Sequence, residues 1–108
     1  MAVQESYLNY IVDQLEAFGN YESKKMFGGV GFFRDGIMFG MIGPDVFRLR
    51  VDDKTRARYE AHGMEPYYSG AKKKGMPYWQ VPEGVLADKN ELKEWAEEAF
   101  QVALRAKK

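Results

Sequence analysis

The sequence predicts an α+β fold, with a mainly antiparallel β-sheet flanked by N- and C-terminal helices and a short middle helix. Apolar residues recur at helical spacing near both ends of the chain. Between these stretches lie short apolar runs rich in glycine, and an Asp35-Gly36 pair separates two of them. An Asp-Gly pair between apolar runs is a strong local signal of a β-hairpin, because it suits a type I′ turn. These observations place strands in the middle of the chain and helices at its ends.

The first helix is expected to run from about Glu5 to Phe18. One face of this segment carries its apolar residues, which are Leu8, Ile11, Val12, Leu15 and Phe18. Gly19 and Asn20 follow, and both tolerate the left-handed backbone conformation that ends a helix. The helix is therefore predicted to end at this pair.

Three or four antiparallel strands in a meander are expected from Tyr21 to Val51. The turn at Asp35-Gly36 joins two of them, and Gly43-Pro44-Asp45 marks the next turn. In the last run, apolar residues alternate with two arginines, Arg48 and Arg50. This alternation is typical of a strand with one face in the core and the other in water.

The middle helix is expected over Lys54 to His62, with Asp52-Asp53 as its N-cap and Gly63 after its last turn. A short edge strand is predicted at residues 65–68, because the proline in it cannot donate to a central ladder. A further strand is predicted from Met76 to Val81.

The last helix follows Asp88, which can cap it, and Glu91 three residues later would complete a capping box. Its apolar face consists of Leu92, Trp95, Ala96, Ala99, Phe100 and Ala103. We expect the two terminal helices to cover one face of the sheet.

Composition excludes several classes of site. The 108 residues include no cysteine and a single histidine, His62, so disulfides, thiol catalysis, cysteine metal centres and multi-histidine sites are ruled out. No serine lies in a nucleophile-elbow sequence. We therefore expect no enzyme, with no catalytic residue, no cofactor and no metal. No apolar run approaches the ~20 residues of a membrane span, and the N-terminus lacks a signal-peptide core, so we expect no membrane association and a cytoplasmic location.

Charge is balanced overall but unevenly distributed. Sixteen basic residues offset sixteen acidic ones, yet residues 24–74 carry eleven bases and six acids. Arg48 and Arg50 share a strand face, and three lysines occupy a loop flanked by tyrosines and a tryptophan: Lys72, Lys73 and Lys74. Basic groups interleaved with aromatics are what single-stranded nucleic acid binds. Against this, a clearly basic domain is expected of a dedicated nucleic-acid binder.

Apolar residues fall on both faces of the predicted central hairpin. Phe32 and Phe33 are consecutive, and so are Met38 and Phe39, whereas successive residues of a strand point to opposite faces. One face is expected to meet the terminal helices, and the other needs a cover, either an additional helix or a partner. Because methionine-rich surfaces are adaptable, we predict a partner surface formed by Met38, Phe39 and Met41, for a protein partner or a second copy of the chain.

The run from Lys25 to Gly40 (KMFGGVGFFRDGIMFG) resembles the signature of the TfoX N-terminal domain, of the TfoX/Sxy family. The similarity continues through Phe47–Asp52 and Met76–Glu83, and into the closing helix with Leu92 and Trp95-Ala96. The resemblance covers nearly the whole chain. It implies a small bacterial α+β domain linked to the regulation of natural competence.

Longer members of the family act as coregulators alongside a DNA-binding transcription factor and carry a second, C-terminal domain. We expect residues 1–108 to form a single domain of the N-terminal type, with no C-terminal TfoX domain. The family supplies no established catalytic or cofactor residues to carry over.

Three functional hypotheses follow. The first is a non-enzymatic regulatory module that acts by protein–protein contact, with a transcription regulator as one such partner. The alternative is an accessory nucleic-acid-binding protein that uses Arg48, Arg50 and the three lysines. The third, a small-molecule enzyme or sensor, ranks last because it needs a deep pocket with convergent polar groups, which no sequence motif indicates.

Overall fold

The computed structural model describes residues 5–26, 29–43, 46–66 and 77–106. Five antiparallel strands form one sheet in the order β1-β2-β3-β4-β5. The strands are β1 (Glu22–Met26), β2 (Gly29–Arg34), β3 (Ile37–Ile42), β4 (Phe47–Arg50) and β5 (Tyr78–Gln80). The helices are α1 (Glu5–Gln14), the 3-10 helix η1 (Leu15–Ala17), α2 (Arg56–Glu60), α3 (Glu83–Leu86) and α4 (Lys89–Ala106). The predicted α+β class and the four-stranded meander before the middle helix are confirmed. Within these ranges no helix combines the length and the apolar character that a membrane crossing requires.

The central hairpin joins β2 to β3 through the predicted turn. Asp35 and Gly36 have φ of 53° and 77°, the two positive values that a type I′ turn needs. Along the hairpin Phe32 is paired with Gly40 and Phe33 with Met38, with a register shift between the two pairs. Phe39 is therefore an extra residue on β3, which is a β-bulge.

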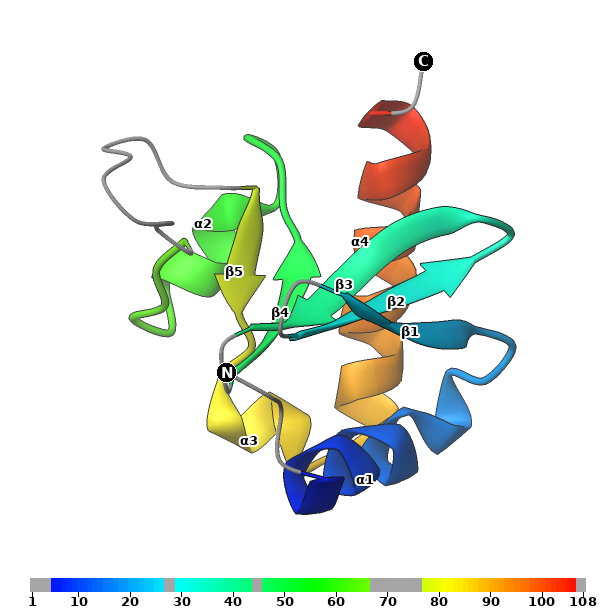
Figure 1. Ribbon diagram of the computed structural model, residues 1–108. Coiled ribbons are helices and arrows are strands. Elements are labelled where there is room, and N and C mark those ends of the chain that lie inside the picture. The colour runs from blue at the N-terminus through cyan, green and yellow to red at the C-terminus, as the bar shows by residue number, and fades with distance from the viewer. Residues whose placement is uncertain (1–4, 27–28, 44–45, 67–76, 107–108) are drawn as a thin grey trace.

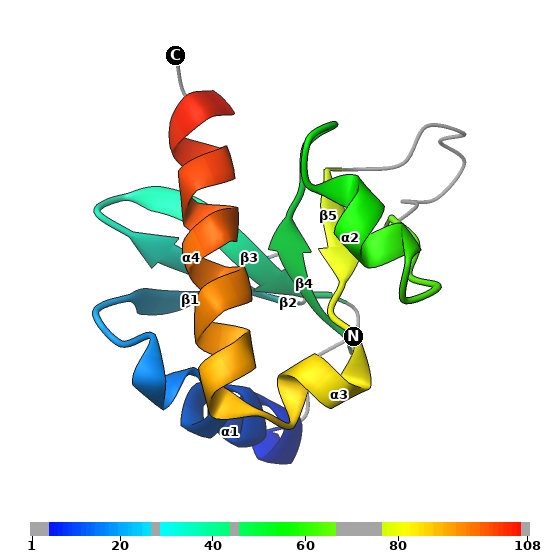
Figure 2. The same ribbon diagram turned by 180° about the vertical axis from the view of Figure 1, so that it is seen from behind.

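The helices lie on one side of the sheet. In Figure 1 the sheet stands in front of α4, and Figure 2 shows α4 crossing the sheet from the other side, with α2 on the same side and α1 and α3 at one end. The predicted apolar face of α4 is buried throughout, at Leu92, Trp95, Ala96, Ala99, Phe100 and Ala103. Opposite it, the sheet contributes Val30, Phe32, Phe39, Ile42, Phe47 and Leu49 to the same core.

The N-terminal helix differs in detail from its prediction. It is α-helical only to Gln14, continues as η1 and ends where predicted, since Gly19 and Asn20 have φ of 57° and 53°. Val12 was expected in the core but is 41% exposed. Gln14 is buried instead, because its side-chain amide donates a hydrogen bond to the Leu86 carbonyl oxygen at 2.9 Å. This bond ties α1 to the end of α3.

The middle helix is shorter than predicted at both ends, because α2 begins at Arg56 rather than Lys54 and ends at Glu60 rather than His62. Its N-cap is Thr55 rather than the predicted Asp52-Asp53. One Asp52 carboxylate oxygen accepts hydrogen bonds from the backbone N–H groups of Lys54 and Thr55, at 3.0 Å each, and so holds a separate turn ahead of the helix. Gly63, with φ of 75°, follows the helix as predicted.

The predicted edge strand is reduced to one bridge between Pro66 and Trp79, and Tyr67 and Tyr68 lie outside the described residues. The strand predicted from Met76 to Val81 is present as β5, three residues long, with Met76 likewise outside the described residues.

The start of α4 differs from its prediction in one detail of its capping. Asp88 caps it as predicted, since its carboxylate accepts from the N–H groups of Asn90 and Glu91 at 3.0 and 3.1 Å. The capping box was wrong, because the Asp88 N–H donates to the Val85 carbonyl at 3.1 Å and needs no partner from Glu91. Val85 belongs to α3, a helix of four residues that the sequence analysis did not predict.

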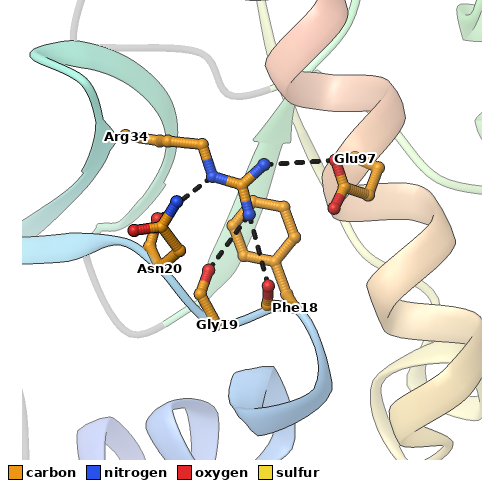
Figure 3. A network of polar contacts seen from close by, with 5 residues as sticks. All are labelled: Phe18, Gly19, Asn20, Arg34 and Glu97. Atoms are coloured by element: carbon orange, nitrogen blue, oxygen red, sulfur yellow. Dashed lines mark hydrogen bonds and ion pairs between the residues drawn. The ribbon is translucent and has the colours of Figure 1, made fainter.

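Arg34, the last residue of β2, links three parts of the fold (Figure 3). Its Nη1 forms an ion pair with Glu97 of α4 at 3.2 Å. Its Nε donates to the Asn20 carbonyl at 3.0 Å, and Nη2 donates to the carbonyls of Phe18 and Gly19 at 3.2 and 3.0 Å. These carbonyls end the first helix, where backbone acceptors have no partner within the helix. The guanidinium thus serves as a C-terminal cap supplied by a strand.

The same guanidinium is stacked on aromatic rings. Its central carbon lies 3.8 Å from the ring centroid of Phe18 and 5.1 Å from that of Phe100. Only 13% of the Arg34 side chain is exposed. A charge so nearly buried is tolerated because carbonyl, carboxylate and ring contacts surround it.

We predict that Arg34→Met lowers the free energy of unfolding by about 2–4 kcal/mol, since it leaves several partly buried acceptors without a donor. Arg34→Lys keeps the charge but not the planar guanidinium, so it should lower the free energy of unfolding by less. Urea denaturation measures both. Arg56→Met is the control, because its ion pair with Asp53 is 54% and 98% exposed and should contribute no more than ~1 kcal/mol. Equal losses in Arg34→Met and Arg56→Met would contradict the role assigned to Arg34.

Asp52 makes stability depend on pH. Burial by itself raises the pKa of this carboxyl, but hydrogen bonds from Arg105 and from the Thr55 and Lys54 backbone, with the Arg105 charge, outweigh burial and hold the pKa below its ordinary value. A carboxyl with a lowered pKa stabilises the fold fully above its unfolded pKa of about 3.9, and this stabilisation is lost as the pH falls through the folded pKa.

We predict that Asp52→Asn, which retains an acceptor oxygen for the turn, is less stable than the parent chain by about 0.5–1 kcal/mol at pH 7. The difference should begin to shrink as the pH falls to about 4, near the unfolded pKa of an aspartate, and should vanish only below the lowered folded pKa. Urea denaturation from pH 7 to pH 3 measures it. Asp53→Asn should show no such trend, because the Asp53 carboxylate is 98% exposed. A difference that persists unchanged at pH 3 would count against this assignment.

Candidate interaction face of the sheet

One face of the sheet, turned toward the viewer in Figure 1, is covered by none of the described helices. Strand register and alternation define which side chains point to it. We call this surface the open face, and it consists of Glu22, Lys24, Phe33, Met38, Met41, Arg48, Arg50, Tyr78 and Gln80. The apolar members at its centre are Phe33, Met38 and Met41, which are half-buried.

Two of the three residues predicted as a partner surface lie on the open face, and one does not. Met38 and Met41 are on it, whereas Phe39 is completely buried on the helix side. Its ring centroid lies 5.0 Å from that of Phe18 and 6.5 Å from that of Phe32. Successive residues of a strand point to opposite faces, so Phe39 points away from Met38, and the bulge returns Met41 to the face of Met38. The inclusion of Phe39 in an exposed surface was therefore wrong.

The Arg48 side chain binds backbone carbonyls between β3 and β4. Its Nη1 donates to the carbonyl oxygens of Gly43 and Val46, the latter at 3.5 Å, and the Gly43 N–H donates to the Val46 carbonyl at 3.1 Å. This arginine therefore braces the connection between β3 and β4. It contributes positive charge to the open face, but its Nη1 already donates to backbone carbonyls.

Arg50 has a different environment. It is the register partner of Tyr78 on β5, and its guanidinium carbon lies 5.5 Å from the Tyr78 ring centroid. Its Nε is buried and has no hydrogen-bond partner among the described residues. The structure thus separates the roles of two arginines that alternation alone had placed together. Lys72, Lys73 and Lys74, the other predicted nucleic-acid contacts, lie outside the described residues.

Lys24 and Phe33 form a pair that the sequence analysis missed. The Lys24 ammonium nitrogen lies 5.5 Å from the centroid of the Phe33 ring, on the neighbouring strand. Cross-strand pairing of β1 with β2 was the signal that could have found it, but the register needed for that pairing follows from the whole sheet.

The charges on the open face are mostly positive. Its charged members are three cations, Lys24, Arg48 and Arg50, and one carboxylate, Glu22. Elsewhere in the described part of the chain, no three His, Cys, Asp or Glu side chains are grouped so as to hold a metal ion. The open face therefore combines an apolar centre with a basic surround, which suits an apolar and acidic surface.

Comparison with known protein families matches residues 13–103 to the TfoX N-terminal domain. The chain belongs to the TfoX N-terminal domain family. A search of curated proteins finds no match. The matched segment begins within α1 and ends within α4, so this TfoX N-terminal domain contains the whole sheet and every residue of the open face. The resemblance inferred from the sequence is confirmed.

We predict that alanine substitutions separate the core side of β3 from its open side. Phe39→Ala should lower the free energy of unfolding by about 3–5 kcal/mol, because it opens a cavity between sheet and helices. Met41→Ala should cost only about 1 kcal/mol, as for a residue that is partly exposed. Urea denaturation of both variants tests this, and equal losses would mean that Phe39 and Met41 do not lie on opposite faces of the sheet.

Proposed function

We propose that this TfoX N-terminal domain is a non-enzymatic regulatory module of the bacterial cytoplasm, which acts by protein–protein contact in gene regulation of the competence type. Family membership supports the regulatory part of the proposal. The single observation that carries the contact part is the open face, a sheet surface with Phe33, Met38 and Met41 half-buried at its centre and none of the described helices over it.

The chemistry of the open face favours a partner with an apolar and acidic surface. Methionine and phenylalanine give the centre adaptable apolar area. Lys24, Arg48 and Arg50 outnumber Glu22 on the same surface. A symmetric pair of copies joined through this face would place these cations against one another, which costs free energy. A different protein with carboxylates around an apolar patch avoids that repulsion.

Nucleic acid is the second candidate. Phe33 with Lys24 near its ring is an arrangement that base stacking and phosphate attraction could use. Two observations favour a protein instead. The guanidinium of Arg48 already binds backbone carbonyls, and the chain has no net charge.

The test uses Met38→Gln/Met41→Gln, which replaces both methionines by polar residues of similar size. Proteins retained from a bacterial lysate by the parent chain, but not by the double variant, are purified and titrated against both by calorimetry. We predict at least about a tenfold loss of affinity in the variant, from the lost burial of two apolar side chains. Val12→Gln is the matched control, because Val12 is exposed on α1, away from the open face.

Three outcomes would count against the proposal. A purified partner that binds the double variant as tightly as the parent chain would show that contact occurs elsewhere. A concentration-dependent dimer in sedimentation, lost in the double variant, would assign the face to a second copy. Fluorescence anisotropy with DNA at 50 and 200 mM salt would assign it to nucleic acid if binding fell about a hundredfold, as four phosphate contacts require.

A further inference from the structure

A pocket opens where the central hairpin diverges from β4 and β5, over the last turns of α4. Its volume is about 280 Å³. Its lining comes from three places, namely the hairpin, the β4–β5 pair and α4: Gly36, Ile37, Met38, Arg50, Tyr78, Ala103 and Ala106. The walls are therefore mainly apolar, with one guanidinium and one tyrosine among them.

Arg50 differs from the other arginines of the chain. Arg34, Arg56, Arg58 and Arg105 each form an ion pair with a carboxylate, and Arg48 binds turn carbonyls. Within the described ranges Arg50 has neither kind of contact, and only the Tyr78 ring lies against its guanidinium. A partly buried guanidinium with neither an ion pair nor a carbonyl contact is costly unless an anion completes it.

The surroundings limit which anion fits. Ala103 and Ala106 belong to the end of α4, where the negative end of the helix dipole disfavours anions, and a dianion more strongly than a monoanion. A pocket of this volume suits a small group, since pockets that hold drug-sized ligands measure roughly 300–1,000 Å³. Ile37 and Met38 supply apolar wall for an aliphatic segment. A single carboxylate on a short carbon chain satisfies all three conditions.

We propose that this pocket binds a carboxylate on a short aliphatic stem, recognised by the guanidinium of Arg50. The planar fork of an arginine matches the two oxygens of a carboxylate, while the stem packs against the apolar walls. Two sources share this chemistry, a glutamate side chain of a partner protein and a free short-chain acid. The inference goes beyond the proposed function, because a free acid would bind with no protein partner present.

The experiment is an NMR titration of the full, ¹⁵N-labelled chain with sodium butyrate. We expect saturable shifts of the Arg50 Nε–H signal and of the backbone amides of Ile37 and Ala103. Sodium chloride at equal ionic strength, and butyramide, which has the same shape without the charge, should not produce them. Sodium phosphate should bind more weakly than butyrate, because the end of α4 repels a dianion.

Variants assign the effect to Arg50. Arg50→Met should weaken butyrate binding at the Ile37 and Ala103 amides by about tenfold or more, the loss expected for a charge-assisted hydrogen-bond pair. Arg56→Met, which removes an exposed arginine at the start of α2, should bind butyrate like the parent chain. If Arg50→Met fails to fold, Arg50→Lys keeps the charge without the fork and should show a smaller loss.

A second pair of probes identifies the source. If the capped peptide acetyl-Ala-Glu-Ala-amide shifts the same signals, and its glutamine counterpart does not, a protein side chain fits the site. If butyrate binds and the glutamate peptide does not, the site takes a free acid. Either result supports the pocket.

Two results would overturn it. One is the absence of saturable shifts with every carboxylate, which would leave Arg50 as a complement to the end of α4 alone. The other is unchanged butyrate binding in Arg50→Met. The butyrate titration uses the chain alone, whereas the calorimetry needs the purified protein partner, so failure of the carboxylate site is distinguishable from failure of the protein contact.

Discussion

The guanidinium of Arg34 holds together parts of the chain that are far apart in sequence. Arg34 is the last residue of β2, and its guanidinium caps the end of the first helix and forms an ion pair with Glu97 of α4. Because it is stacked on Phe18 and is nearly buried, its charge has to be matched on every side. That requirement sets where the first helix ends relative to the sheet. The same contact adds an ion pair to α4, whose buried apolar face packs on one side of the sheet and leaves the other side as the open face.

Local physical rules predicted much of this fold. The Asp35-Gly36 turn, the left-handed pair after the first helix and the buried face of α4 each depend on a few neighbouring residues, and all three are confirmed. The missed features depend on distant residues. A four-residue helix such as α3 shows no periodicity, and the bulge at Phe39 exists only through pairing with β2. Arg34 looks from its sequence like an ordinary polar residue at a strand end.

The candidate site was predictable only in part, and for the same reason. Alternation correctly placed Arg48 and Arg50 on one face of β4, but it says nothing about what each guanidinium meets. The β3–β4 turn supplies carbonyls to Arg48, whereas Arg50 lies beyond the last pairing between β3 and β4, where the strands diverge. Two residues apart, the same side chain is a structural brace in one position and an unpaired charge in the other.

This divergence also explains how the open face could combine adaptability with selectivity. Met38 lies both at the apolar centre of the face and in the lining of the Arg50 pocket, so the two surfaces are continuous. Methionine side chains adjust to many apolar shapes and discriminate weakly among them. A guanidinium in a small pocket discriminates strongly, because a partner that brings an apolar group but no carboxylate leaves that charge buried and unpaired. Selectivity would then come from the cost of the wrong occupant rather than from the area of the contact.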